Sequence, residues 1–373
     1  MAAVTNDETA GPPAVPPAFG APRDLALLRR ALDLAARGLL TDPNPRVGAV
    51  VTNGTGAVVG VGFHAGAGTP HAEVVALSDA AAAGADVRGG TAYVSLEPCA
   101  HTGRTGPCAE ALLAAGISRL VFAQSDPTDL ARGGADVLRA GGVTVVGGLL
   151  ADEAHALNAT WTRSQRLGRP VVTWKLATTL DGRAAAADGS SRWITGPQAR
   201  ADVHDLRSTC GAVVVGTGTV LADDPHLTTR WPDGSLRDRQ PLRVVVGERD
   251  LPPGAAVVDG TAPSLHLRTH SPYEVVEALW DKGIRHVLLE GGPTLAAAFL
   301  SAGLVDDVVA YVAPVLLGGG ARTVADLGIT TIDAALRLEP TDVTVFGPDV
   351  RVTARPVLHP ATPQKTRDTK EHH

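Results

Sequence analysis

The spacing of apolar residues in the first half of the chain alternates between a helical period and short β-type runs. Residues 24–40 carry apolar side chains three and four positions apart, which predicts an amphipathic helix. An Asn-Gly turn at 53–54 separates two short runs rich in Val and Gly, which predicts a β-hairpin. Helical stretches at 71–83, 108–116 and 135–142 then alternate with the strand-like runs TAYVSL, RLVFAQ and VTVVGGL. This alternation predicts a layered α/β domain.

The second half of the chain repeats the alternation after a polar stretch, LNATWTRSQRLGRP, which ends in Gly-Arg-Pro. We expect strands from the runs VVTWKLATTLDGR, GAVVVG, LRVVV, SLHLR, HVLLEGG, DDVVAYVAP and VTVFGPDVRVTAR. The segments GPQARADVHDLRS, SPYEVVEALWDKG and PTLAAAFLSAG between them have helical spacing. The pattern predicts two α/β domains, 23–168 and 169–357, with a disordered leader at 1–22 and a disordered tail at 358–373.

Length, charge and cysteine content narrow the class of protein. The chain has 373 residues, 44% of them hydrophobic, which suits two globular domains. Its formal net charge of -6 does not indicate the excess of basic residues that is typical of nucleic-acid-binding proteins. Three cysteines are too few, and odd in number, for a disulfide framework, and no apolar run approaches a membrane span. Because the first residues also lack the basic and apolar regions of a signal peptide, we expect a cytoplasmic protein with no membrane partner.

Three motifs in the first half contain the residue types of a catalytic zinc site. His71 and Glu73 stand at the start of a predicted helix. Cys99 follows a predicted strand, and Cys108 begins the next helix. One imidazole and two thiolates leave a fourth tetrahedral position for water, whose pKa zinc lowers to roughly 7. Glu73 can then carry the proton to a ring nitrogen and a leaving amine, and this order of residues is typical of nucleobase deaminases, although the two cysteines are farther apart here.

The same residues also admit simpler interpretations. A His-x-Glu pair on its own is commonly a surface coincidence, and a lone cysteine is commonly a small core residue. His101 is an alternative zinc ligand, and Cys210, far along the chain, is most simply a structural free thiol. A structural zinc domain, a nucleic-acid-editing deaminase and a deaminase with an inactive second half all stay open at this point.

Longer motifs carry a resemblance to one enzyme family. EPCAHTGRTGPC, with DPNPRVGAV and HAEVVAL before it, resembles the deaminase domain of the bifunctional riboflavin-biosynthesis deaminase/reductase family. KLATTLDGR, SRWITGPQAR, GTGTVLADDPHLTTR, LLEGGPTL and APVLLGGG resemble its reductase domain, so the likeness covers about residues 24–355. The chain departs from the family pattern at Gly106, where a proline is usual, and in the segment DPTDLARGG at 126–134, where the family has Asp-Pro-Asn-Pro and a glycine-rich turn.

The resemblance implies an N-terminal cytidine-deaminase-like α/β/α zinc domain followed by a dihydrofolate-reductase-like α/β domain. It implies that the first domain uses Zn2+ to deaminate a small-molecule substrate, 2,5-diamino-6-(5-phosphoribosylamino)pyrimidin-4-one. It implies that the second uses NADPH to reduce the ribosyl side chain of 5-amino-6-(5-phosphoribosylamino)uracil to ribityl. It also implies a homo-oligomer, a homodimer or a homotetramer.

For the deaminase, the resemblance places Asn44 and His64 at the substrate site. The amide of Asn44 is able to donate to and accept from a pyrimidine edge, although a turn asparagine is the simpler interpretation. His64 is otherwise an ordinary histidine at the end of a strand. Arg104, in the loop between the two cysteines, is a candidate for the substrate phosphate or merely a solvated loop charge.

For the reductase, two glycine-containing turns, Gly216–Thr219 and Gly291–Thr294, follow apolar strands, and their backbone amides are able to approach a pyrophosphate. Neither is a Rossmann fingerprint. The resemblance places the cofactor at Thr178, Trp193, Thr219, Asp223, Gly292, Pro293, Thr294 and Leu295. It places the substrate at Ser191, Arg207, Leu227, Arg230 and Glu290.

Charged residues of the second half suggest how the reductase handles its substrate. Lys175 and Asp223 are candidates for proton delivery to the reacting sugar carbon, because an ammonium or a carboxylic acid can donate as hydride arrives. Lys175 is one of only four lysines among 33 basic residues and stands inside an apolar run, so we prefer a catalytic role to a snorkelling one. Arg207 and Arg230 suit a ribose phosphate, because a guanidinium binds phosphate with two hydrogen bonds.

Overall fold

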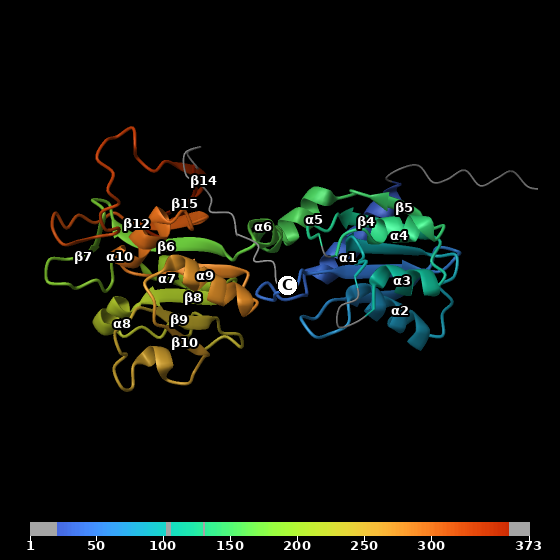
Figure 1. Ribbon diagram of the computed structural model, residues 1–373, viewed down its shortest axis with the longest axis horizontal. Helices are drawn as coiled ribbons and strands as arrows, with labels where there is room; N and C mark the ends of the chain where they lie inside the picture. Colours follow the sequence, from blue (N-terminus) through green and yellow to red (C-terminus); the bar gives the residue numbers. More distant parts are fainter. Residues whose placement is uncertain (1–20, 102–105, 130, 358–373) are drawn as a thin grey trace, which may run out of the picture. The chain divides into compact units, whose positions relative to one another are not determined.

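The structure is a computed structural model with two compact units (Figure 1). It describes residues 21–101, 106–129 and 131–357. Unit 1 contains the described residues up to Gly38 together with Arg46–Leu157. Unit 2 contains Leu39–Pro45 and the residues from Asn158 onward. Within the described ranges, no helix is both long enough and apolar enough to cross a membrane.

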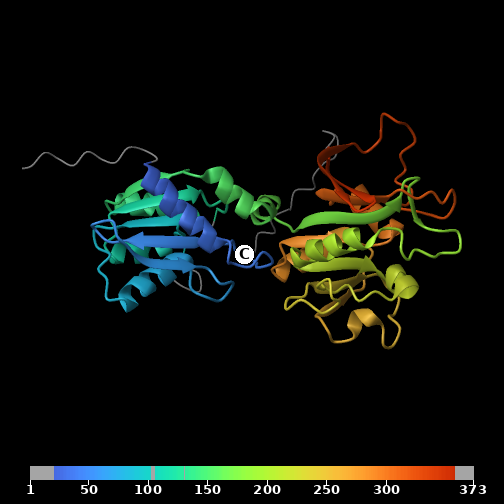
Figure 2. The same cartoon turned by 180° about the vertical axis from the view of Figure 1, so that it is seen from behind.

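Unit 1 is a five-stranded sheet between two layers of helices. Its elements are α1 (Pro22–Ala35), β1 (Gly48–Thr52), β2 (Val58–Phe63), α2 (Ala72–Ala82), β3 (Thr91–Leu96), α3 (Cys108–Ala114), β4 (Arg119–Gln124), α4 (Gly134–Ala140), β5 (Thr144–Gly147) and α5 (Ala151–Leu157). The strand order is β2-β1-β3-β4-β5, with β1 antiparallel to both neighbours and β3, β4 and β5 parallel. Buried residues of α1 and α5 pack on one face of the sheet, which Figure 2 shows with α1 in blue, and those of α2, α3 and α4 pack on the other. The predicted α/β/α arrangement is confirmed.

Two glycines of β2 bring the helix of the His-x-Glu motif close to the sheet. A Cβ atom on Gly60 would lie 2.1 Å from the carbonyl oxygen of Ala76, and one on Gly62 would lie 2.5 Å from that of Ala72. Only a residue without Cβ permits this approach. Helix α2 therefore lies directly on β2, with His71 as its N-cap residue.

Unit 2 is built on an eight-stranded sheet with helices on both faces (Figure 1). Its elements are α6 (Ala159–Leu167), β6 (Val171–Thr179), β7 (Arg183–Ala185), α7 (Pro197–Ser208), β8 (Ala212–Gly216), α8 (Thr217–Asp223), β9 (Leu242–Val246), a 3-10 helix (Ala256–Val258), β10 (Ser264–Leu267), α9 (Pro272–Asp281), β11 (His286–Leu289), α10 (Pro293–Ser301), β12 (Asp307–Ala313), β13 (Ala321–Arg322), β14 (Leu338–Phe346) and β15 (Asp349–Pro356). The strand order is β10-β9-β8-β11-β6-β12-β15-β14, of which the first six are parallel. Helices α9 and α10 pack on one face, and α7 and α8 on the other.

Several elements differ from the sequence prediction, and three of them affect its motifs or boundaries. The helix predicted over 24–40 ends at Ala35, and turns follow it. The run VTVFGPDVRVTAR is not one strand but the end of β14 and most of β15, because Gly347, with φ at +63, turns the chain between them. The turn predicted at Gly216–Thr219 is the start of α8, which begins at Thr217.

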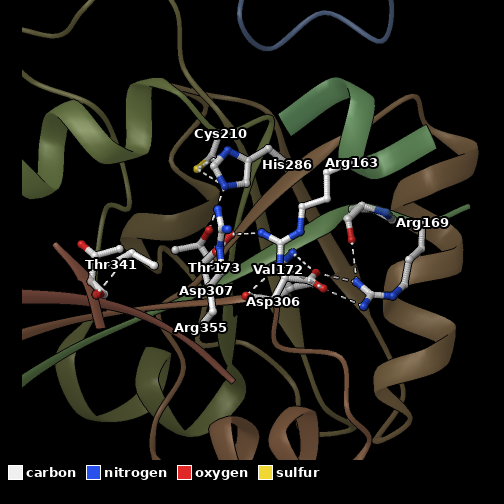
Figure 3. A network of polar contacts seen from close by, with 12 residues as sticks. Arg163, Arg169, Val172, Thr173, Cys210, His286, Asp306, Asp307, Thr341 and Arg355 are labelled. Carbon is white, nitrogen blue, oxygen red and sulfur yellow. Dashed lines mark hydrogen bonds and ion pairs between the residues drawn. The ribbon is translucent and has the colours of Figure 1, made fainter. Parts of the chain in front are cut away.

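Helix α6 packs with unit 2, whereas the sequence prediction places the domain boundary after residue 168 (Figure 3). Arg163 donates to the Asp307 carboxylate at 2.7 Å and to the backbone oxygen of Asp306 at 2.9 Å. Arg169 donates two hydrogen bonds, of 2.6 and 2.9 Å, to the Asp306 carboxylate, which is 8% exposed. These charge-assisted bonds fasten α6 and the segment after it to the sheet of unit 2.

Candidate active sites

The predicted zinc ligands lie together in unit 1, where β3 ends and two helices begin. The ligand atoms of His71, Cys99 and Cys108 all lie within 4.8 Å of one another. His71 Nδ1 is 3.2 Å from Cys108 Sγ and 3.6 Å from Cys99 Sγ. His71 is the N-cap residue of α2 and Cys108 is the first residue of α3, so two helix N-termini begin at the cluster. In the described part of the chain, no other such group of three ligand residues occurs.

These separations fit a tetrahedral zinc ion. Zinc–sulfur bonds of about 2.3 Å and zinc–nitrogen bonds of about 2.0–2.1 Å, at tetrahedral angles, separate nitrogen from sulfur by about 3.6 Å. The two nitrogen–sulfur distances lie close to this value. The amide of Cys108 also donates to Cys99 Sγ at 3.4 Å, as an orienting contact to a ligand does. One histidine and two cysteines leave the fourth position open.

The surroundings of the two thiols favour a thiolate at Cys99 but not at Cys108. The Cys108 thiol, and more weakly the His71 imidazole, hold the pKa of Cys99 well below its usual range against the effect of burial. Contact with Cys99, together with burial, keeps the pKa of Cys108 above its usual range. The pair therefore shares one proton, which a dication bound to both sulfurs displaces.

Glu73, the residue predicted to move the proton at this site, is a buried acid. It stands in the first turn of α2 and is 4% exposed. Burial raises the pKa of its carboxyl to about 7, against the opposing effect of the nearby His71. A carboxyl with a pKa near neutrality can take up and return a proton at physiological pH, as general acid–base catalysis needs.

Two other histidines, His64 and His101, are near the zinc-ligand candidates in sequence. They have different surroundings in the structure. His64 is 5% exposed, and its ring centroid lies 5.4 Å from that of His71. Its Nδ1 is 3.1 Å from the Pro70 oxygen, so the ring orientation is fixed. The structure therefore places His64 beside the zinc-ligand candidate His71, and its role in binding substrate stays a prediction. His101 is outside the ligand cluster, and its buried Nδ1 has no hydrogen-bond partner among the described residues.

The two remaining residues predicted for this site stay predictions. Asn44 lies in the segment Leu39–Pro45, which packs with unit 2, and its amide donates to Asp42 Oδ1 at 2.9 Å in a local turn. In the same segment, the Pro43 oxygen accepts from Trp161 Nε1 of α6 at 3.1 Å. Arg104 lies outside the described residues.

Unit 2 contains a partly buried group of three charged side chains from β6, α7 and the end of β11. Arg207 donates two hydrogen bonds to Glu290, from Nε to Oε1 at 2.6 Å and from Nη2 to Oε2 at 2.9 Å. Lys175 Nζ lies 3.7 Å from Glu290 Oε2. The third nitrogen of Arg207, Nη1, donates to the Thr228 oxygen at 3.1 Å. The structure thus brings three residues predicted for the reductase into direct contact.

The charges in this group are strongly coupled. Burial raises the pKa of Glu290, but the charges of Arg207 and Lys175 outweigh it and bring the pKa to about 2. Burial lowers the pKa of Lys175, with Glu290 opposing, so its ammonium gives up a proton more readily than an exposed lysine does. Arg207 was predicted as a phosphate ligand, but each of its three nitrogens already donates to a protein oxygen. In this structure it anchors Glu290.

The two predicted glycine-containing turns lie side by side at the carboxyl ends of β8 and β11, which are parallel neighbours. Gly292, the N-cap residue of α10, donates its amide to Thr219 Oγ1 at 3.2 Å. Pro293 begins α10, and a Cβ on Gly216 would lie 4.0 Å from Leu295 Cβ. The carboxyl edge of parallel strands is where α/β sheets bind ligands, so the predicted cofactor positions Thr219 and Gly292–Leu295 form one surface there.

The other residues predicted for the reductase are spread over neighbouring loops. Thr178 is 8% exposed on β6, and Trp193 is 69% exposed with the Arg200 guanidinium 4.5 Å from its ring centroid. Asp223 is the last residue of α8, and Ser191 is partly buried. Leu227 is buried with a positive φ of 54, and Arg230 donates to the Gly234 oxygen at 2.8 Å. Their roles stay predictions.

Sequence reasoning missed three residues that support these sites. Thr228 receives Arg207 through its backbone oxygen, which no side-chain pattern reveals. His204, one turn before Arg207 on α7, also contacts that oxygen, at 3.2 Å. Glu97 accepts backbone hydrogen bonds beside the zinc site, and its position directly before Pro-Cys in the motif was the available signal.

Cys210 is a buried free thiol beside His286, in agreement with the sequence interpretation (Figure 3). Its Sγ donates to the Leu206 oxygen at 3.4 Å and lies 3.4 Å from His286 Nδ1. Burial raises the pKa of this thiol to about 12, so it stays protonated. A protonated thiol is a poor nucleophile.

Two family models match the chain. The cytidine and deoxycytidylate deaminase zinc-binding region matches residues 22–124, and the RibD C-terminal domain matches residues 170–352. The riboflavin biosynthesis protein RibD of Mycobacterium tuberculosis is 50% identical over 311 residues, which is 83% of this chain and 90% of that protein. RibD of Escherichia coli is 40% identical over 365 residues, or 88% of this chain and 98% of that protein.

Solved structures give the same result over 90% of the chain. Acinetobacter baumannii RibD superposes with a TM-score of 0.78 at 38% identity, covering 90% of this chain and 99% of that one. A diaminohydroxyphosphoribosylaminopyrimidine deaminase/5-amino-6-(5-phosphoribosylamino)uracil reductase from Thermotoga maritima has a TM-score of 0.77 at 32% identity, with the same coverage. Each of these related chains therefore contains counterparts of both units.

Proposed function

Because the chain belongs to the RibD family of riboflavin-biosynthesis proteins, we propose that its two units catalyse two consecutive reactions at the sites described above. The protein is a bifunctional deaminase and reductase of riboflavin biosynthesis, and its cofactors are zinc and NADPH. The zinc-ligand cluster beside a buried glutamate carries the assignment of the first reaction to unit 1. We assign deamination to residues 23–168 and reduction to residues 169–357.

In the first reaction, 2,5-diamino-6-(5-phosphoribosylamino)pyrimidin-4-one loses its ring amine. Zinc, when bound by the His-Cys-Cys cluster, supplies a Lewis acid that activates water. Glu73 takes one proton from the attacking water and passes it to the ring nitrogen, then takes the second proton from the added hydroxyl and passes it to the leaving amine, which its raised pKa supports. We assign His64 and Asn44 to the pyrimidine ring and Arg104 to the phosphate.

In the second reaction, the ribosyl chain of 5-amino-6-(5-phosphoribosylamino)uracil is reduced to ribityl. NADPH, when bound along Thr219 and the first turn of α10, supplies the hydride. Of the two candidate proton donors, we favour Lys175 over Asp223, because burial lowers the Lys175 pKa and Glu290 holds the ammonium in place. With Glu290 fixed by Arg207, we assign Arg230 rather than Arg207 to the substrate phosphate.

We also assign the protein to a cytoplasmic homo-oligomer, a dimer or a tetramer. Its three cysteines are free, as suits a reducing compartment. Strand β14 is the last strand of its sheet, and it exposes Val343 by 62% and Val345 by 68%. Apolar residues on an edge strand favour pairing with another chain. Replacing both valines by lysine should lower the mass measured by sedimentation equilibrium, and an unchanged mass would locate the contact elsewhere.

The function is tested by incubating the purified protein with the diaminopyrimidinone phosphate, with and without NADPH, and following the products by mass spectrometry. Without NADPH we expect amine loss to stop at the uracil. With NADPH we expect a further gain of two hydrogens. If the deaminated compound fails to consume NADPH, the reductase assignment is wrong, and unit 2 is then a partner without activity.

A further inference from the structure

The segment 126–134, where the chain departs from the family pattern, is held at both ends by one buried carboxylate. Glu97 Oε2 accepts the amide of Asp126 at 3.3 Å. Glu97 Oε1 accepts the amides of Gly133 at 3.1 Å and of Ala135 at 3.2 Å. The first contact fixes the start of the segment after β4, and the other two fix its end and the first turn of α4. We call residues 126–134 the clasped loop.

The clasped loop also lies directly against the backbone that carries Cys99. The amide of Ala100 donates to the Ala131 oxygen at 3.1 Å. A Cβ atom on Gly134 would lie 1.8 Å from the Pro98 oxygen, a separation that no side chain allows. Hydrogen bonds and close packing therefore join the loop to the residues on either side of the zinc ligand.

Glu97 is itself held firmly, and it makes no ion pair among the described residues. It is 9% exposed, and its backbone amide donates to the Gln124 oxygen at 2.8 Å. In place of a cation, three amides satisfy its carboxylate, two of them from the start of α4. Carboxylates are well placed at helix N-termini, where backbone amides lack partners. A neutral glutamine at this position would have one acceptor oxygen and would turn its NH2 group toward an amide.

We propose that Glu97 is a positioning residue of the deaminase, which holds the clasped loop as one wall of the pyrimidine site beside Cys99. The inference rests on the proposed deaminase function. Glu97 acts through the loop and does not touch the reacting atoms. Its loss should therefore affect how the substrate is held more than how the proton is moved, because Glu73 and the zinc ligands keep their own contacts.

The test compares wild type with Glu97→Gln in the full-length, zinc-loaded protein. We expect KM for the diaminopyrimidinone phosphate to rise about tenfold or more, with kcat lowered by less than that factor. Zinc content by metal analysis, and NADPH consumption with the deaminated substrate, should stay at wild-type values. Glu110→Gln, an exposed glutamate on α3, is the matched control and should change nothing.

A second variant loosens the loop without touching Glu97. Thr128 Oγ1 donates to Asp126 Oδ1 at 2.6 Å and accepts the Ala131 amide at 3.2 Å. Thr128→Ala should also raise KM, by about threefold. If Glu97→Gln does not fold, this variant alone tests whether the clasped loop positions the substrate. Unchanged KM in both variants, or loss of zinc with a proportionate fall in kcat, overturns the proposal. A wild-type protein without deaminase activity would instead overturn the proposed function.

Discussion

The two sites place one residue type, a buried glutamate, in opposite environments. Glu73 in unit 1 has no ion pair among the described residues, and burial raises the pKa of its carboxyl to about 7. The side chain of Glu290 in unit 2 is 7% exposed, but the charges of Arg207 and Lys175 bring its pKa to about 2. The first carboxyl can exchange a proton near neutrality, whereas the second remains a carboxylate and serves as an anchor for two cations. The partner of a buried acid, and not its burial, thus separates a proton carrier from an anchor.

The largest expected effect comes from removing Glu73, the proposed proton carrier. Glu73→Gln should lower the rate of deamination by about 10³-fold, within the range that general acid–base groups contribute. NADPH consumption with the deaminated substrate should be unchanged, because unit 2 holds its own site. Stability should also be unchanged, since glutamine replaces a buried acid that has no ion pair to lose. Substantial deaminase activity in this variant would mean that the cluster is a structural zinc site.

The matching change in unit 2 should act mainly on stability. Glu290→Gln leaves Arg207 and Lys175 buried without their carboxylate, and breaking a buried pair costs about 3–5 kcal/mol. All five tryptophans lie between positions 161 and 280, so tryptophan fluorescence in urea reports the unfolding of unit 2. We expect a lower urea midpoint with deaminase activity retained. An unchanged midpoint would show that the charges are not coupled in solution.

Substitution of Lys175, which lies beside Glu290, should lower the rate of reduction without breaking the contact that stabilises the site. Lys175→Met keeps the Arg207–Glu290 contact but removes the favoured proton donor, so kcat of the reductase should fall about 10²-fold. The substrate KM should change little. Lys282→Met, at an exposed position after α9, is the matched control. A fall confined to KM would mean that Lys175 binds substrate and that Asp223 or another group delivers the proton.

The same contrast explains how much of each site the sequence could predict. The zinc ligands and Glu73 lie on adjacent elements and open helices or follow a strand, so a short motif sufficed to place all of them together. The cluster around Glu290 joins β6, α7 and β11, and only the sheet order brings these elements together. The motifs predicted that Lys175, Arg207 and Glu290 are site residues. They did not predict that Arg207 pairs with Glu290.

The fold shows the same limit. Apolar periodicity located most helices and strands, because each buries one face on a sheet. It missed α8, because Gly216 and Gly218 at its start are typical of a turn, and it joined β14 to β15 across the turn at Gly347. It also could not reveal contacts made by backbone atoms, such as the Thr228 oxygen that receives Arg207.

The smallest expected effect concerns a second paired acid, which lies in unit 1. It tests whether pairing lowers the pKa of an acid and stabilises the fold in both units, or only at the Glu290 site. Asp24 in unit 1 is 3% exposed and, like Glu290, is paired: Arg119 donates to its two oxygens at 2.8 Å each, and Tyr93 donates at 2.9 Å. The Arg119 hydrogen bonds hold the pKa of Asp24 below its usual value. Its contribution to stability is therefore complete above the unfolded pKa of about 3.9 and is lost as pH falls through the lower folded pKa.

Asp24→Asn should accordingly destabilise unit 1 at pH 7 by about 1.5–3 kcal/mol, the contribution of hydrogen bonds to a charged group. The difference from wild type should shrink as the pH falls below about 4, because Asp24 of the unfolded wild-type chain takes up a proton there before the folded carboxylate does. Hydrogen–deuterium exchange in urea, read from peptides of α1 and β4, measures this unit separately from the tryptophan signal of unit 2. A difference that stays constant down to pH 3 would mean that the carboxylate charge contributes nothing. Of the two paired acids, Glu290 and Asp24, only Glu290 would then stabilise its unit through its charge.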